Sequence, residues 1–165
     1  MKVAFLDRDG TINKDYPDAE WTAVRAPELL DGAAEAMRYL TSLGYRIIII
    51  TNQYIIGEGF ISLAQYESFT RRLLTELEAE GVKVLDVFYC PHRRDSGCDC
   101  CKPRSGMIRA ACEKYPQIHL AQSFYAGDSM ADMQMAQACG LCFYGINLPC
   151  ENPIGSLSEL KQLLS

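Results

Sequence analysis

The sequence has no apolar run long enough to cross a membrane, since the longest candidates, such as residues 47–50, have only the length of a strand. It has no N-terminal leader pattern either, because a strand-like apolar segment begins at residue 3. Internal repeats, linkers and low-complexity segments are also missing. These absences argue against a membrane-spanning or secreted protein, and we expect a single cytoplasmic domain over residues 1–165.

Basic residues are too few for a typical nucleic-acid-binding surface. The chain has 16 Lys and Arg against 21 Asp and Glu, which gives a net charge of −5, and this balance argues against a nucleic-acid partner. An acidic protein can still bind a phosphate group, but it then needs a metal ion, a lysine or backbone N–H groups at the site. The expected partner is a small molecule, with no membrane partner, and the expected state is a monomer.

Apolar segments of strand length alternate with segments of helical periodicity. Strands are expected at 3–6, 46–50, 84–89, 123–126 and 142–146, and helices at 32–43, 62–81, 106–115, 131–139 and 156–164. Ser62 with Gln65, and Ser156 with Glu159, are predicted capping boxes. This alternation predicts an α/β fold, a parallel sheet with helices on both faces and a site beyond the carboxyl ends of its strands. The helix that follows Ser62 is expected to bury Leu63, Tyr66, Phe69, Leu73 and Leu77.

Polar side chains stand where the predicted strands end. Asp7 and Asp9 follow the first strand two residues apart, so both can face one side, where their charges repel unless a cation lies between them. Mg²⁺ prefers such oxygen ligands, and Asp128 supplies a further carboxylate at the end of another strand. The alternative is a pair of turn-forming aspartates. The sequence therefore predicts a magnesium site formed by Asp7, Asp9 and Asp128.

Four of the eight cysteines cluster around a histidine. Cys90-x-His92, followed after five residues by Cys98-x-Cys100, supplies three thiolates and an imidazole, a complete tetrahedral set typical of structural zinc. The loop has little apolar content, so bound zinc would provide its order. The alternatives are reduced thiols, a disulfide, or Cys101 as a ligand in place of Cys100. The remaining cysteines are expected to be buried small apolar residues: Cys112, Cys139, Cys142 and Cys150.

Four ordered motifs resemble those of the haloacid dehalogenase superfamily of phosphotransferases: Asp7-x-Asp9-Gly10-Thr11, Thr51 after a strand, Lys102, and Gly127-Asp128-x-x-x-Asp132. The resemblance covers nearly the whole chain. It implies a Rossmann-like domain without a large cap, into which a zinc-binding loop is inserted at about residues 90–101. It also implies a Mg²⁺-dependent phosphatase that acts through an aspartyl-phosphate intermediate.

The resemblance assigns a role to each motif residue. Asp7 would attack phosphorus, and Asp9 would protonate the leaving oxygen and then activate water. Thr51 would hold phosphate oxygens, and Lys102 would neutralise charge on Asp7 and the phosphate. Asp132 would orient Lys102 or the metal-bound waters, or would serve only as a carboxylate in the first turn of its helix.

Shorter segments narrow the resemblance. Thr51-Asn52-Gln53, Cys90-Pro91-His92, Cys98-Asp99-Cys100 and Lys102-Pro103-x-x-Gly106-Met107 are similar to segments of heptose-bisphosphate phosphatases and histidinol-phosphate phosphatase domains. The last segment looks more like the heptose enzymes, so the expected reaction is hydrolysis of D-glycero-D-manno-heptose 1,7-bisphosphate at its 7-position. The alternatives are histidinol phosphate or another small phosphomonoester as substrate, or a non-catalytic, zinc-stabilised binding protein. Nucleic-acid 3′-phosphatases share the Thr-Asn-Gln segment, but their added basic surface is not evident here.

Two positions depart from the heptose-enzyme pattern. Cys101 and Glu58 stand where these enzymes carry arginines that would contact substrate, and a cysteine cannot offer the bidentate fork of a guanidinium. Loop arginines nearby are candidate replacements, with a solvated position as the alternative for each. The expected substrate-binding residues are Thr11, Asn52, Gln53, Arg93, Arg94 and Arg104.

Overall fold

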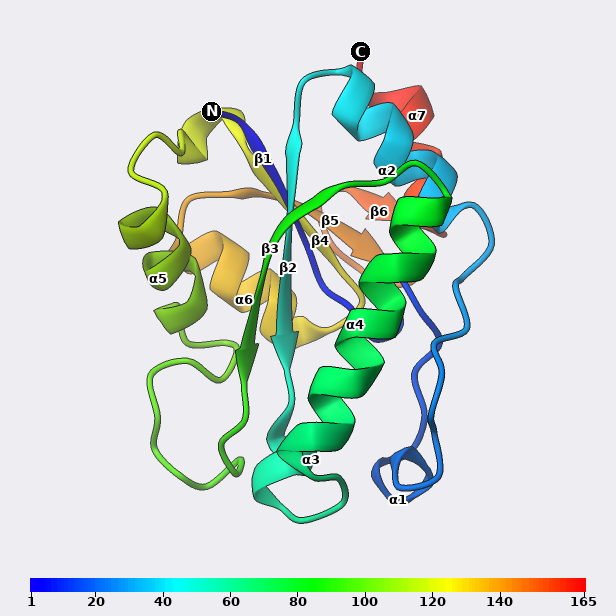
Figure 1. Ribbon diagram of the computed structural model, residues 1–165. Coiled ribbons are helices and arrows are strands. Elements are labelled where there is room, and N and C mark those ends of the chain that lie inside the picture. The colour runs from blue at the N-terminus through cyan, green and yellow to red at the C-terminus, as the bar shows by residue number, and fades with distance from the viewer.

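Side chains of the central strands alternate between two apolar clusters, one on each face of a sheet. The computed structural model describes residues 1–165 (Figure 1). All strand pairs are parallel, in the order β3-β2-β1-β4-β5-β6, which confirms the predicted fold class. The strands are β1 (Val3–Leu6), β2 (Arg46–Asn52), β3 (Val84–Cys90), β4 (Phe124–Gly127), β5 (Cys142–Ile146) and β6 (Pro153–Ile154). The helices are α1 (Asp18–Trp21), α2 (Ala33–Ser42), α3 (Tyr54–Gly57), α4 (Leu63–Ala79), α5 (Gly106–Lys114), α6 (Met130–Ala138) and α7 (Leu160–Leu163), with 3₁₀ turns η1 (Leu120–Gln122) and η2 (Leu157–Glu159).

The helices cover both faces of the sheet, as an all-parallel sheet requires. Ala4 and Leu6 of β1 pack in one cluster with residues of α2, α4 and α7. Val3 and Phe5 of the same strand pack in the other cluster, with residues of α5 and α6. Figure 1 shows these two groups of helices on opposite sides of the strands. Each fully buried Leu, Ile or Phe contributes roughly 1.5–3 kcal/mol, so this two-sided core holds the strand ends in place.

The carboxyl ends of the strands meet at one edge of the sheet because the strands run in the same direction. In Figure 1 the arrows of β2 and β3 point down, toward α1, α3 and the loop that follows β3. The functional site is therefore to be sought at this edge. No helix is long or apolar enough to span a bilayer.

The expected helix caps were only partly correct. The capping box of α4 is confirmed, because Ser62 Oγ accepts from Gln65 N at 3.1 Å and Gln65 Oε1 accepts from Ser62 N at 2.8 Å. The box expected at Ser156 is wrong: its side chain makes no capping bond, and Glu159 accepts from Gly155 N instead. A 3₁₀ turn followed by one short helix replaces the long final helix.

Burial differs from expectation at two places. Leu63 is 46% exposed, because the main core takes only Leu73 and Leu77 from α4 and the first turn lies outside it. Cys142, the first residue of β5, is exposed. The other three cysteines expected to be buried are only partly so: Cys112, Cys139 and Cys150.

Candidate active site

Asp7 continues β1 by one residue and ends in a tight loop. Its backbone N–H donates to the carbonyl of Ala126 at 2.9 Å, so the ladder between β1 and β4 aligns the two strand ends. Gly10 follows with φ +84°, and a Cβ at this position would collide with the carboxylate of Asp128. A glycine is needed here for both reasons, and it lets the loop after β1 approach the loop after β4 closely.

Lys102 lies at the centre of the site, almost completely buried. Its Nζ donates to Asp7 Oδ1 and Asp132 Oδ1, both at 2.8 Å, to the carbonyl of Ile50 at 3.0 Å and to the hydroxyl of Tyr125 at 3.2 Å. Burial opposes the charged ammonium, but Asp132 and Asp7 outweigh it and raise the pKa of Lys102. The lysine is therefore held as a cation against Asp7, as expected.

Three carboxylates meet beside this lysine. Oxygen atoms of Asp7, Asp128 and Asp132 lie within 4.8 Å of one another. Burial, followed by the charge of Asp132, raises the pKa of Asp7 well above its ordinary value, and burial also raises the pKa of Asp128. A divalent cation would oppose both shifts, and hard Mg²⁺ prefers such oxygen donors. The donor set therefore fits Mg²⁺, and Asp7 and Asp128 are the side chains available to hold it.

Asp132 is engaged on both of its oxygens. Oδ1 accepts from Lys102 and from Tyr125, while Oδ2 accepts from the backbone and hydroxyl of Ser129 at 3.1 and 2.7 Å. Ser129 Oγ in turn accepts from Asp132 N, which completes a capping box on α6. The two roles considered for this residue are thus combined, because it orients Lys102 and also caps its own helix.

Asp9 does not belong to the group of three carboxylates. Oδ1 accepts from Arg8 Nε at 2.7 Å and from Asn13 Nδ2 at 3.0 Å, while Oδ2 accepts from Arg8 Nη2 at 3.0 Å and from Gln53 Nε2 at 2.9 Å. These donors occupy the carboxylate, so ligation of Mg²⁺ by this side chain, as expected from the sequence, would require it to leave them. The side chain still forms part of the wall of the cleft described below.

The Thr51-Asn52-Gln53 segment organises the site from the end of β2. Thr51 and Asn52 line the cleft, whereas Gln53 is buried and donates to both Asp9 and Thr51 Oγ1. Asn52 acts as a clamp on the backbone of Lys102, since its Oδ1 accepts from Lys102 N at 2.8 Å and its Nδ2 donates to Lys102 O at 3.2 Å. Thr11, Asn52 and Gln53 were expected to bind substrate. Thr11 and Gln53 are buried and contact other site residues instead, and Thr11 donates to Asp7 Oδ2 at 3.2 Å.

A cleft of about 250 Å³ opens over these groups. Its lining contains six aspartates and one basic residue, Lys102, so the walls are strongly acidic. None of the three loop arginines expected to bind substrate lines it. Apolar surface comes from Trp21, Tyr54 and Ile55, contributed by α1 and α3. The complete lining is Asp7, Asp9, Asp15, Asp18, Trp21, Thr51, Asn52, Tyr54, Ile55, Lys102, Asp128, Ser129, Ala131 and Asp132.

Arg94 is the expected arginine that comes nearest to the cleft. Its Nη2 pairs with Asp18 at 3.0 Å, its Nη1 lies 3.8 Å from Glu58, and its guanidinium carbon lies 3.6 Å above the ring of Tyr54. Asp18 and Tyr54 line the cleft, whereas Glu58 does not. Arg94 therefore joins the loop after β3 to the rim formed by α1 and α3. The other two arginines are directed elsewhere: Arg93 pairs with exposed Asp95, and Arg104 is exposed without an ion pair.

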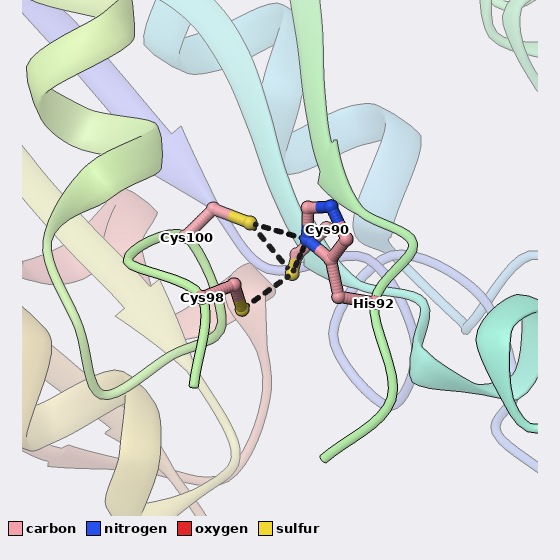
Figure 2. Close-up of side chains that lie close together, drawn as sticks. All are labelled: Cys90, His92, Cys98 and Cys100. Atoms are coloured by element: carbon pink, nitrogen blue, oxygen red, sulfur yellow. Dashed lines mark hydrogen bonds between the residues drawn. The ribbon is translucent and has the colours of Figure 1, made fainter. Parts of the chain in front are cut away.

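The predicted zinc ligands converge at the end of β3. Figure 2 shows Cys90, His92, Cys98 and Cys100 pointing toward one another. His92 Nδ1 lies 3.1 Å from Cys100 Sγ, and Cys90 Sγ lies 3.6 Å from Cys98 Sγ. One ion can therefore reach three thiolates and an imidazole, a set that fits zinc and leaves no open position. Cys101 is not part of the group, because it is buried and packs in the apolar cluster beside α5.

Sequence reasoning missed several residues of the site. Arg8 stands between two predicted functional aspartates and could have been noticed from that position alone. Asp15, Asp18 and Trp21 come from a segment that showed neither strand nor helix periodicity, and no sequence signal indicated that it reaches the cleft. Tyr125 looked like an ordinary core residue of a strand, although its hydroxyl contacts Lys102.

Comparisons with known proteins agree with this geometry. The family model described as "Polynucleotide kinase 3 phosphatase" matches residues 2–143. D-glycero-beta-D-manno-heptose-1,7-bisphosphate 7-phosphatase of Pseudomonas putida is 39% identical over 140 residues, which are 85% of this chain and 79% of that protein. D-glycero-alpha-D-manno-heptose-1,7-bisphosphate 7-phosphatase of Photorhabdus laumondii is 36% identical over 174 residues, covering 93% and 90% of the two chains.

A solved structure extends the likeness to the whole fold. The crystal structure of D,D-heptose 1,7-bisphosphate phosphatase from B. bronchiseptica, complexed with magnesium and phosphate, matches with a TM-score of 0.88 at 26% identity. The match covers 99% of this chain and 98% of that one. On the family match, these relatives and the site geometry, the chain belongs to the polynucleotide kinase 3 phosphatase family of the haloacid dehalogenase superfamily of phosphatases.

Proposed function

We propose that the protein hydrolyses D-glycero-D-manno-heptose 1,7-bisphosphate at its 7-phosphate through an aspartyl-phosphate on Asp7. The observation that carries the proposal is the contact of Lys102 Nζ with Asp7 Oδ1 at 2.8 Å inside the acidic cleft. This contact holds a carboxylate nucleophile beside a fixed cation. The relatives from P. putida and P. laumondii, whose names specify this substrate, support the choice of sugar.

The first half-reaction transfers the phosphoryl group to Asp7. A carboxylate oxygen of Asp7 attacks phosphorus as the bond from phosphorus to the sugar oxygen breaks, and Asp9, which enters this step in its protonated form, gives its proton to that sugar oxygen. Lys102 offsets the charge that gathers on the transferred group, and Thr51 lies in the cleft wall where a phosphate oxygen can be held. Positioning and charge neutralisation provide most of the acceleration in such transfers.

The second half-reaction returns the enzyme to its starting state. Asp9, now ionised, accepts a proton from a water molecule as that water attacks phosphorus, and the bond from phosphorus to Asp7 breaks. Inorganic phosphate leaves and Asp7 is free again. Mg²⁺ held by Asp7 and Asp128 would supply neutralisation of phosphate charge, and zinc held by the cysteine cluster would supply order to the loop.

The far end of the substrate meets the rim formed by α1, α3 and the zinc loop. Arg94 is the cation available there for a second phosphate, but it is paired with Asp18 and Glu58. To bind a distal phosphate, the Arg94 guanidinium would therefore give up its contacts with Asp18 and Glu58 and contact the phosphate instead. A charge-assisted contact contributes about 1.5–3 kcal/mol, so we expect roughly a ten- to hundred-fold preference for the bisphosphate over the corresponding monophosphate.

The test is a comparison of kcat/KM for both anomers of the heptose 1,7-bisphosphate, the heptose 7-phosphate and histidinol phosphate. We expect the bisphosphate to be the best substrate, with loss of most of its advantage in Arg94→Met. Arg93→Met is the matched control, because Arg93 pairs only with exposed Asp95 and should leave the preference unchanged. A higher kcat/KM for histidinol phosphate would overturn the heptose assignment.

Two further assays separate the remaining alternatives. A 3′-phosphorylated oligonucleotide tests the activity that the family description suggests, and the acidic cleft predicts poor turnover of this polyanion. Phosphate release with and without Mg²⁺ tests the alternative of a non-catalytic, zinc-stabilised binding protein. A protein that releases no phosphate from any of these esters would refute the phosphatase assignment itself.

A further inference from the structure

Arg8 is a completely buried arginine outside the group of residues that meet at Lys102. It is 1% exposed, and it is one of the largest fully buried side chains of the protein. Burying a guanidinium away from water is unfavourable unless it is paired, and such residues are rarely kept without a reason. Its only ionic partner is Asp9, the next residue in the chain.

The contact between Arg8 and Asp9 is a two-pronged fork. Nε donates to Oδ1 at 2.7 Å and Nη2 donates to Oδ2 at 3.0 Å, so both carboxylate oxygens are held at once. A fork of this kind sets the plane of a carboxylate as well as its distance, which a single-point donor cannot do. Asn13 and Gln53 add one bond to each oxygen and complete the cradle.

Aromatic rings enclose the other side of the guanidinium. Its central carbon lies 4.6 Å from the ring centroid of Phe69, 5.6 Å from that of Trp21 and 5.7 Å from that of Tyr66. The third nitrogen, Nη1, has no hydrogen-bonding partner. Ring faces attract the cation and leave it little room to turn, so all of its directed hydrogen bonds serve Asp9.

Arg8 has no direct access to the substrate. It does not line the cleft, whereas Asp9 and Trp21 do. Any effect of Arg8 on the reaction must therefore pass through Asp9, whose carboxylate must face the leaving oxygen at hydrogen-bond range to transfer a proton.

We propose that Arg8 is a positioning residue that holds the Asp9 carboxylate in one orientation at the cleft wall, so that proton transfer to the leaving oxygen is fast. The inference rests on the proposed phosphatase function. The fork restrains the Asp9 side chain. The three aromatic rings keep the guanidinium in place, so it cannot move together with the carboxylate. Without the fork, only the single bonds from Asn13 and Gln53 remain on the two oxygens, so the plane of the carboxylate is held less firmly.

The experiment uses two aryl phosphates of similar shape that differ in their need for a proton. Phenyl phosphate releases a basic phenol and depends on general acid help, whereas p-nitrophenyl phosphate releases a much less basic phenol and needs little. Single-turnover release of each phenol isolates the first half-reaction from the later attack of water. We expect Arg8→Met to slow release from phenyl phosphate by about a hundred-fold, and release from p-nitrophenyl phosphate by less than about threefold.

Three controls tie the effect to Asp9. In an Asp9→Asn background the additional change Arg8→Met should have no further effect on either ester, because the group that Arg8 positions is gone. Arg72→Met removes an exposed arginine from a helical ion pair and should leave both rates unchanged. Arg8→Lys keeps a cation within the rings but cannot form the fork, so it should show the same ester selectivity even where Arg8→Met folds poorly.

Equal slowing of the two esters by Arg8→Met or Arg8→Lys in folded enzyme would overturn the inference and leave the proposed function intact, since a merely structural role lowers both rates together. Persistence of the Arg8 effect in the Asp9→Asn background would also overturn it. A wild-type enzyme that releases neither phenol, and no phosphate from the heptose 1,7-bisphosphate, would refute the proposed function, and the inference with it.

Discussion

Replacement of Asp132 by asparagine is the sharpest test of how Lys102 is held. Asp132 is 1% exposed, and each of its oxygens accepts two hydrogen bonds. Asparagine keeps the shape but has one accepting oxygen and one amide nitrogen that can only donate. Whichever way the amide turns, it loses either the bonds from Lys102 and Tyr125 or the bonds from Ser129.

The magnitude follows from burial and charge. Removal of one partner of a buried ion pair typically costs about 3–5 kcal/mol, and Lys102 keeps its second carboxylate, Asp7, so we expect the lower end of this range, about 3 kcal/mol. For a chain of 165 residues, 1 kcal/mol shifts Tm by about 2–4 °C, so Tm should fall by roughly 6–12 °C. A loosened Lys102 should also lower kcat about ten- to hundred-fold.

Thermal unfolding followed by circular dichroism, together with kcat for phosphate release, measures both effects. Ser62→Ala is the matched control, because it removes the other capping box and Ser62 does not line the cleft. That change should cost about 1 kcal/mol and leave kcat unchanged. If Asp132→Asn loses no more Tm than Ser62→Ala and retains its kcat, the argument that Asp132 anchors Lys102 is wrong.

The remaining predictions concern the nucleophile, the cysteine cluster and a peripheral ion pair. Asp7→Asn should abolish turnover while the circular dichroism spectrum stays unchanged, and a rate within a few-fold of the parent would exclude an aspartyl-phosphate. Protein purified without chelators should contain one zinc per chain, and Cys98→Ser should release it and raise KM while Tm falls only slightly, because residues 92–97, between Cys90 and Cys98, are exposed. Burial opposes the ionised form of Asp86, but hydrogen bonds from Lys114, Tyr115 and a backbone N–H outweigh it and lower its pKa. Its stabilising contribution is therefore present above the ordinary pKa of 3.8 and is lost as the pH falls through the lowered value, so the difference in unfolding free energy between wild type and Asp86→Asn should shrink below about pH 4. A difference that stays constant down to pH 2 would contradict this assignment.

Local signals in the sequence were sufficient for five of the six strands and for the order of the motifs, whereas the two-residue β6 was not predicted. Strands such as 3–6 and 47–50 are short apolar runs that end at a polar residue, and burial on both faces leaves them few alternatives. The cluster of three cysteines and a histidine was also predictable, because all four residues lie within one short segment and their spacing is itself the signal.

Tertiary contacts decided the partners where a side chain had a choice. Asp9 was expected to ligate Mg²⁺ together with Asp7, yet Arg8, Asn13 and Gln53 hold its carboxylate. Asn52 was expected to bind substrate, yet it clamps the backbone of Lys102. Such contacts depend on which donors the fold brings within about 3 Å of an acceptor. The spacing of residues along the chain does not determine that distance.

The sequence by itself determined the fold class, the order of the motifs and the cluster of Cys90, His92, Cys98 and Cys100, because periodicity and motif spacing are local properties of the chain. Tertiary structure alone decided the electrostatics of the cleft. Asp15 and Asp18 come from a segment without periodicity, and Arg94 comes from the distant zinc loop. Only the folded chain brings Arg94 beside Asp18, because ion pairing falls off within a few ångströms and depends on where the fold places each charge.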